Sequence, residues 1–273
     1  MFNDTRWTWE TEVPQQAGFH PFLLQGLVAV SALHLGSLKS PNSETYYSTA
    51  YKSYRNATVL FRTAVSDINK DNCIAVLAFS LLVSVFQFGI SNAPGSKLAT
   101  GTPLSYLDVV LALRGAWSLI SQLHLYLSQS KVQGLFTQRR NFGCLELPEE
   151  TQYALDSLRL LNQSASATMG SGLACSEAIN MLGLWFSATS ASPSTWLHLV
   201  WWPSRVPDAY ISLIKANEPV ALIILCHWCV GIHRAAPRWF LSGWAAQTFA
   251  TVKRLLGDDW EYALQWPSRE IVV

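Results

Sequence analysis

Apolar residues occupy every side of one stretch of the chain, and we expect the other segments to be arranged around it. Residues 74–90 carry no formal charge, and Gln87 is their only strongly polar side chain. Asp71 and Asn72 offer an N-cap just before this run, and the turn-forming residues 91–95 end it. A helix that is apolar all round must be enclosed by other helices or by lipid. Because a membrane span usually needs about 20 such residues, we predict a central helix wrapped by its neighbours rather than a span.

Helical periodicity continues along most of the chain. The clearest amphipathic helix begins at Ser43 or Glu44 and runs to about Lys70. Further helices are expected at Pro21–Leu38, after Ser105, from Pro148 to the break at 170–172, from there through Phe186, from Ser194 to Pro203, from Pro207, from Pro219, at Trp239–Leu256 and at Asp258–Trp266. Residues 1–19 are expected to drape over the surface, 91–104 to form a loop and 130–147 to form a mobile loop. No alternating strand pattern is found, so we predict an all-α fold, one domain of about ten helices spanning 1–273.

The composition is unusually apolar for a chain with so little sign of a membrane span. Half of the 273 residues are hydrophobic, 14% are charged and 12 are Trp. Surplus apolar and aromatic side chains can line a hydrophobic pocket for a lipid-like ligand or cover a protein interface. They can equally form one large aromatic core. With a net charge of +1, the chain lacks the basic face that phosphate backbones demand, so we expect no direct nucleic-acid binding by this chain alone.

The cysteines indicate a reducing environment. Their number is odd and most are isolated, and the first residues lack the apolar core of a secretory signal. We therefore expect an intracellular protein. The five cysteines are Cys73, Cys144, Cys175, Cys226 and Cys229.

Little in the chain points to catalysis or to a metal. Nothing fits a phosphate loop, a dinucleotide fingerprint, a zinc-protease helix or a nucleophile elbow. The segment 226–229, CHWC, is the one local cluster of ligand-type residues, but a structural zinc needs about four ligands. We expect its cysteines to pack in the core, with no metal and no cofactor. The histidines His34, His124, His198 and His233 are interpreted as packing residues, whereas a His227 that faces a cavity remains a candidate acid or base.

Several segments, in order along nearly the whole chain, resemble one family. They are FHPFLLQGLVAVSALHL (19–35), YYSTAYKSYRNATVLFRTAV (46–65), NCIAVLAFSLLV (72–83), VWWPSRVPDAYISLIKANEPVALIILCHWCVGI (200–232), RWFLSGW (238–244) and DWEYALQWP (259–267). This set is similar to the regulatory domain of fungal zinc-cluster transcription factors, sterol uptake control subgroup.

The resemblance implies an all-helical C-terminal domain with a deep apolar pocket for a sterol such as ergosterol. It also implies that ligand occupancy controls the nuclear import and DNA-binding parts, through a glycine-containing loop whose matching position is Gly243. The expected localisation is the nucleus and/or the cytoplasm. The family's six-cysteine zinc cluster and its basic linker are missing, so we expect an isolated regulatory domain or one that has left transcription.

Three functional hypotheses follow. The first is a module that senses a sterol-like apolar ligand and controls sterol or secondary-metabolite genes. Its candidate binding residues are Phe79, Phe86, Trp117, Trp185, Trp228, Trp239 and Gly243. The second is a cyclase or isomerase of secondary metabolism that reuses the pocket, because such chemistry can rest on positioning alone. The third is a homo- or heterodimerisation partner of full-length regulators, with exposed aromatic area on the helix at 46–68.

Overall fold

The helices form two units, Met1–Arg140 and Asn141–Val273. The computed structural model describes residues 6–91, 93, 106–127, 130, 132, 146–169, 172–189 and 195–271, without the side chains of 166–169 and 197. Every element in these ranges is helical, which confirms the all-α class. That a single regulatory domain spans 1–273 stays a prediction.

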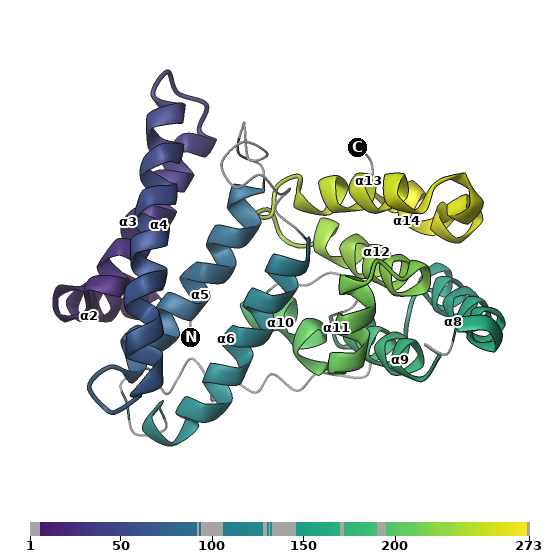
Figure 1. Ribbon diagram of the computed structural model, residues 1–273, viewed down its shortest axis with the longest axis horizontal. Coiled ribbons are helices and arrows are strands. Elements are labelled where there is room, and N and C mark those ends of the chain that lie inside the picture. Colours follow the sequence, from purple (N-terminus) through teal and green to yellow (C-terminus); the bar gives the residue numbers. More distant parts are fainter. Residues whose placement is uncertain are drawn as a thin grey trace. The chain divides into compact units, whose positions relative to one another are not determined.

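The first unit combines two pairs of neighbouring helices with a short N-terminal segment. Its elements are η1 (Thr8–Glu12), α2 (Val13–Phe19), α3 (Pro21–Ser37), α4 (Ser43–Ser66), α5 (Cys73–Ile90) and α6 (Tyr106–Leu127). In Figure 1, α3 and α4 lie side by side as a hairpin, and α5 lies beside α6. Helix α5 also contacts α3, so it joins the two pairs.

Helix α5 is the central helix that its composition predicted. Its buried side chains include Ala75, Phe79 and Leu82, which share one hydrophobic cluster with α2, α3 and α6. In the described part of the chain α5 alone is long and apolar enough to cross a membrane, and α11 and α12 pass the same test only as a pair bent by 104°. Because 72% of α5 is buried inside the structure, it has the surroundings of a core helix.

Helix α5 starts where it was predicted to start, but the Asn72 side chain does not form the predicted capping hydrogen bond. Asn72 is the N-cap, yet its side chain makes no hydrogen bond to the helix. Its Oδ1 accepts from the backbone N–H of Asn69 at 2.9 Å, and its Nδ2 donates to the carbonyl of Asp67 at 2.9 Å. The side chain therefore stabilises the turn between α4 and α5, which also explains why α4 ends before the predicted Lys70.

The expectation that residues 1–19 drape over the surface was wrong for the part that is described. Residues 8–19 are helical, and Val13 and Ala17 are buried in the core of the first unit. Pro14 suggested an irregular segment, but α2 continues directly from the π-helical turn η1, and Pro14 follows that turn.

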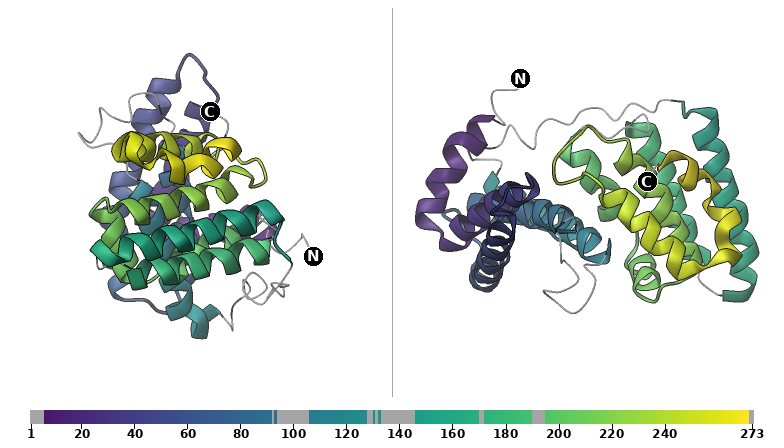
Figure 2. Two further views of the ribbon diagram at one scale, coloured as in Figure 1. Left: turned by 90° about the vertical axis from the view of Figure 1, so that its right-hand side faces the viewer. Right: turned by 90° about the horizontal axis from the view of Figure 1, so that it is seen from above.

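The second unit is layered around one buried helix. Its elements are α8 (Glu149–Met169), α9 (Gly172–Thr189), α10 (Trp196–Arg205), α11 (Asp208–Lys215), α12 (Pro219–His233), α13 (Trp244–Leu256), η2 (Asp258–Leu264) and α14 (Gln265–Glu270). Figure 2 (left) shows α12 between the layer of α8 and α9 and the layer of α13 and α14. The chain thus has a second central helix, α12, besides α5.

Several helix boundaries near prolines and glycines differ from the predicted ones. Pro203 lies inside α10, which ends two residues later, and Pro267 lies within the first turn of α14 instead of ending a helix. Helix α13 begins at Trp244 rather than at Trp239, because Gly243 before it has a left-handed backbone (φ 74°). The N-cap of α10 is Thr195, whose side chain accepts from the backbone N–H of His198 at 3.3 Å. The predicted caps Ser105 and Ser194, and nearly all of the loops 91–104 and 130–147, lie outside the described residues.

Candidate functional site

Helix α12 places the most deeply buried side chains of the second unit. Every residue from Val220 to Ile232 is buried. The helix is well defined at its start, because the Glu218 carboxylate accepts from the backbone N–H of Ala221 at 2.7 Å and Pro219 occupies the first turn. A helix apolar on all sides needs neighbours all round, and α8, α9, α11, α13 and α14 supply them.

Trp228 is the centre of an aromatic cluster in this unit. Its ring stacks on Trp202 at 5.2 Å between centroids and meets Trp244 edge-on at 5.7 Å. It also lies 6.4 Å from Trp185. All four indoles are fully buried, and they come from α9, α10, α12 and α13. We call Trp185, Trp202, Trp228 and Trp244 the tryptophan cluster.

The indole N–H groups of this unit differ in whether they have an acceptor. Trp185 donates to the carbonyl of His198 at 2.6 Å, and Trp202 donates to the carbonyl of Ala178 at 3.1 Å. The buried Nε1 atoms of Trp196, Trp228 and Trp266 have no acceptor among the described residues. A buried N–H without a partner costs about 1–3 kcal/mol. A bound hydroxyl or carbonyl oxygen would satisfy any of these three N–H groups.

His227 lies beside this cluster as a neutral imidazole. Its ring stacks on Trp266 at 5.2 Å, and its Nδ1 lies 2.8 Å from the carbonyl of Ile223. A carbonyl can only accept, so Nδ1 carries the proton and Nε2 carries the lone pair. Burial lowers the pKa of His227 to about 4, and the hydrogen bond to Ile223 opposes that shift. At neutral pH the ring is therefore an uncharged hydrogen-bonding group and only a weak base.

The three described cysteines of this unit are packing residues. Cys175, Cys226 and Cys229 are buried and unpaired in disulfides. Burial raises the pKa of Cys175 to about 12 and raises the pKa of Cys226 and Cys229 further. A protonated thiol is neither a nucleophile nor a metal ligand. In the described ranges, no three or more His, Cys, Asp or Glu side chains gather as a metal site would require.

Gly243 connects the tryptophan cluster to the segment before α13. Its left-handed backbone costs roughly 1–2 kcal/mol for a residue with a Cβ. The next residue, Trp244, is the one whose ring meets Trp228. On the other side of Gly243, Phe240 is buried and lies 5.7 Å from the half-buried Trp239. The glycine thus sets the direction in which Trp244 enters the cluster.

The first unit has its own buried aromatic group with a polar centre. Tyr54 stacks on Phe86 at 4.0 Å with nearly parallel rings, and Tyr51 meets Phe86 edge-on. The Gln87 amide donates to the Tyr54 hydroxyl at 2.9 Å. The Tyr51 hydroxyl and the Gln87 Oε1 are buried and have no hydrogen-bond partner in the described residues. Burial raises the pKa of Tyr54, although the bond from Gln87 lowers it.

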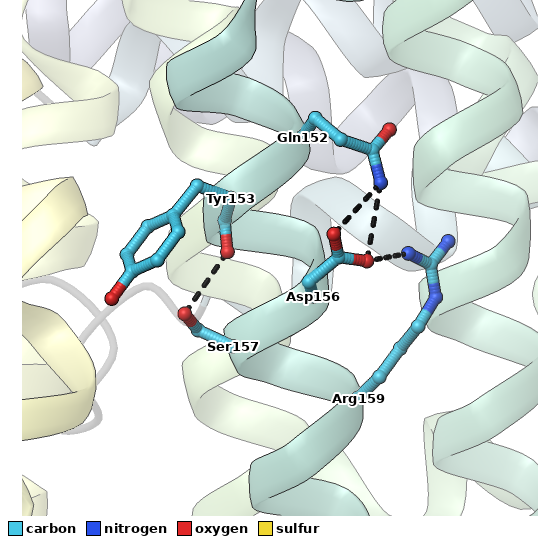
Figure 3. A network of polar contacts seen from close by, with 5 residues as sticks. All are labelled: Gln152, Tyr153, Asp156, Ser157 and Arg159. Carbon is cyan, nitrogen blue, oxygen red and sulfur yellow. Dashed lines mark hydrogen bonds and ion pairs between the residues drawn. The ribbon is translucent and has the colours of Figure 1, made fainter.

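A third polar group, on α8, is a surface feature. The Asp156 carboxylate accepts from Gln152 at 3.1 Å and from Arg159 at 2.5 Å, and both partners lie on the same helix (Figure 3). The Ser157 hydroxyl donates to the carbonyl of Tyr153 alongside. The bond from Gln152 and that from Arg159 lower the pKa of Asp156. These contacts are one turn apart and exposed, so they stabilise α8 and form no binding site.

Comparison with known proteins finds a similarity over part of the chain. Over 97 residues the chain is 30% identical to Sterol uptake control protein 2 of Candida albicans. The alignment covers 36% of this chain and 13% of that protein, so the chain matches a small part of its relative's length. No family model matches the chain, and no solved structure matches it.

The seven predicted binding residues are divided between the two units. Phe79, Phe86 and Trp117 belong to the first, on α5 and α6. There Phe79 packs against Phe22 and Phe61, and Trp117 is half-buried.

The other four predicted residues belong to the second unit. Trp185 and Trp228 contact each other in the tryptophan cluster, and Gly243 adjoins that cluster through Trp244. Trp239 packs against Phe240. That all seven line one ligand site stays a prediction.

Sequence reasoning missed two members of the aromatic core of the second unit. Trp202 was not singled out, although WWP at the end of a short apolar helix is a pattern of large side chains at a helix terminus. Phe186 contacts both Trp185 and Trp266. In the sequence it served only to locate a predicted helix. Trp244 meets Trp228 of α12, and Trp266 meets Phe186 of α9 and His227 of α12; these partners could not be identified from the sequence alone.

Proposed function

We propose that this chain is a ligand-sensing module of a nuclear transcription regulator, and that it binds a sterol or a similar apolar metabolite. The similarity to Sterol uptake control protein 2 supports a regulator-like role. The controlled genes would be those of sterol or secondary metabolism. We place the ligand at the tryptophan cluster of the second unit.

The observation that carries this placement is the unpartnered indole N–H of Trp228 in an apolar setting. A sterol is an apolar body with one hydroxyl, so its binding site needs mostly hydrocarbon and aromatic walls and a few polar groups. The tryptophan cluster offers aromatic walls and the N–H donor of Trp228, and Trp266, which stacks on His227, adds a second donor; neither N–H has an acceptor among the described residues. His227 Nε2, next to Trp266, is an acceptor for the hydroxyl proton of such a ligand.

Gly243 provides the link from ligand to regulation in this proposal. A ligand that contacts Trp228 would displace or hold Trp244, whose ring lies 5.7 Å away. Because Trp244 directly follows the left-handed Gly243, movement of its ring changes the backbone of the preceding segment, which contains Trp239 and Phe240. A ligand shifts such an equilibrium only as far as it binds the two arrangements differently.

Titration of the purified chain with ergosterol, followed by tryptophan fluorescence, tests the proposal. We expect a saturable change, and a weaker one with the analogue that lacks the hydroxyl. In Trp228→Phe, the loss of one hydrogen bond should weaken ergosterol binding by about 2- to 13-fold and remove the difference between the two sterols. Trp260→Phe is the matched control, because Trp260 lies in η2 and stacks on Tyr262, outside the tryptophan cluster. No saturable change, together with no co-purified lipid, would contradict the proposal.

The enzyme hypothesis makes a different prediction in the cell. If the chain were a cyclase or isomerase, deletion of its gene would change a metabolite while the transcripts of the surrounding pathway stayed constant. For the regulator proposed here, we expect those transcripts to change. His227 is buried and stacks on Trp266, and its pKa of about 4 makes it a weak general base at neutral pH.

A further inference from the structure

Helix α3 is apolar on both of its faces. Its inner face carries mostly small residues, and its neighbours approach very closely there. A Cβ at Gly26 would lie 2.6 Å from the Phe79 ring of α5, and one at Gly36 would lie 3.0 Å from the Tyr47 ring of α4. The small residues of the inner face let α3 pack closely against α4 and α5, beside the large buried side chains Phe22, Leu23 and Leu33, and further large apolar side chains lie on the outside.

The outer face of α3, together with its C-cap residue Leu38, forms a regular stripe. Leu24, Val28, Leu35 and Leu38 are exposed, with 39% to 62% of their surface accessible, and the small Ser31 lies between them. The spacing along 24, 28, 31, 35 and 38 is four, three, four and three residues, which is the repeat of a coiled-coil seam. We call these five residues the α3 stripe. A helix that is apolar all round is normally enclosed, and no described helix of the first unit covers the stripe, whose four large side chains are exposed.

We propose that the α3 stripe is the interface through which two copies of this chain pair, with their α3 helices antiparallel. A two-fold interface must be complementary to itself, and the stripe is nearly symmetric about Ser31. Antiparallel pairing places Leu24 of one copy against Leu38 of the other and Val28 close to Leu35. It brings the two Ser31 side chains together at the axis, where their small size lets the helices approach.

Electrostatics favours the antiparallel arrangement over the parallel one. The stripe carries no formal charge, and the exposed Lys39 follows directly after it. Parallel pairing would place the two Lys39 ammonium groups side by side and align the two helix dipoles. Antiparallel pairing separates the lysines by the length of the helix and sets each helix terminus against the opposite terminus of its partner.

The size of the stripe indicates a weak dimer. Fourteen residue steps at 1.5 Å give a seam of about 21 Å, or two heptads. A standard stable interface buries about 800 Å² on each partner, which a seam of this length does not reach alone. Helix α3 is already held in place by α4 and α5, so pairing requires no folding of the helix. We therefore expect dissociation in the micromolar range. This inference does not depend on the proposed ligand.

Cysteine cross-linking of the full chain tests the geometry. In a Cys144→Ser background, Ser31→Cys should form a covalent dimer on mild oxidation, because a disulfide needs Cα atoms about 4.4–6.8 Å apart. Leu24→Cys alone should not cross-link, whereas a mixture of Leu24→Cys with Leu38→Cys should. Self-cross-linking of Leu24→Cys, with none in the mixture, would overturn the antiparallel arrangement. Leu160→Cys, at an exposed leucine of α8, is the control for random collision.

Sedimentation velocity over a range of concentrations tests the association itself. The unmodified chain should self-associate as its concentration rises, and Leu35→Glu should weaken that association at least 10-fold while leaving the helical signal in far-ultraviolet circular dichroism unchanged. Leu160→Glu should associate like the unmodified chain. A chain that is monomeric at all concentrations overturns the proposal. So does a monomer that binds phosphatidylcholine vesicles through the stripe, because the stripe would then be a membrane contact.

Discussion

Replacement of Gly231 by alanine tests how tightly the second unit is packed. A Cβ at this position of α12 would lie 2.3 Å from Cζ3 and 2.4 Å from Cη2 of Trp185, and 3.2 Å from Cε1 of Phe186. Non-bonded carbon atoms prefer about 3.5–4.0 Å. The Trp185 ring would therefore have to move by more than about 1 Å. It is fully buried, and its N–H is bonded to the carbonyl of His198, so it has no free direction of movement.

The expected magnitude follows from two opposing effects. Alanine in place of glycine in a helix interior gains about 1 kcal/mol from helix propensity. Overpacking of a closed core costs typically about 1–3 kcal/mol, occasionally more, and displacement of a whole indole belongs at the upper end of that range. We therefore expect Gly231→Ala to lower the free energy of unfolding by about 2 kcal/mol.

Gly183→Ala in the same unit is the matched control. A Cβ there would lie 3.5 Å from Leu155 Cδ1, which is an ordinary contact, so the propensity gain of up to about 1 kcal/mol should remain. Urea unfolding, followed by tryptophan fluorescence and by circular dichroism, measures both variants. The two should differ by about 3 kcal/mol. Equal stability of Gly231→Ala and Gly183→Ala would refute the close packing of α12 on α9.

Three further substitutions or conditions have definite expected outcomes. The pKa of His227 is about 4 in the folded chain and about 6.5 when unfolded, so the unfolded state binds more protons below pH 6.5 and stability falls as the pH falls. The loss between pH 7 and pH 5 should be about 2 kcal/mol in urea titrations, and it should disappear in His227→Phe; an unchanged loss in that variant would contradict the assignment. Gly257 has φ 71° and ψ −172°, a conformation nearly confined to glycine, so Gly257→Ala should cost about 1–3 kcal/mol in the same titrations. Tyr54→Phe leaves the buried Gln87 amide without its partner and should cost about 1–3 kcal/mol in thermal unfolding, whereas removal of the amide itself in Gln87→Leu should cost less. The reverse order would exclude a stabilising role for that hydrogen bond.

The sequence predicted the elements well where composition alone decides them. The run 74–90 is a buried helix because it has no charge and few polar groups, and 219–233 follows the same logic. The amphipathic helix at 43–66 was predicted from its periodicity. These are local properties, and each can be inferred without knowledge of a neighbour.

The sequence could not show which aromatic side chains meet. Phe79 and Trp185 have the same apolar helical context, yet one packs in the first unit and the other in the second. The side chain of Asn72 caps a turn and not the helix, because Asp67 and Asn69 compete for its hydrogen bonds. Such outcomes depend on tertiary partners far away in the sequence, or on local competition that a single cap motif does not include.

The buried thiols give each unit an internal reporter of its own transient opening. Cys73 belongs to the first unit, and Cys175, Cys226 and Cys229 belong to the second. An alkylating reagent reacts with the thiolate of an accessible cysteine, so each of these residues is modified only when its surroundings open. Mass spectrometry of peptides gives the modification rate of Cys73 and of the other three cysteines. Comparison of these rates therefore measures whether the two units open independently of each other. A ligand bound in one half would slow the labelling of that half alone.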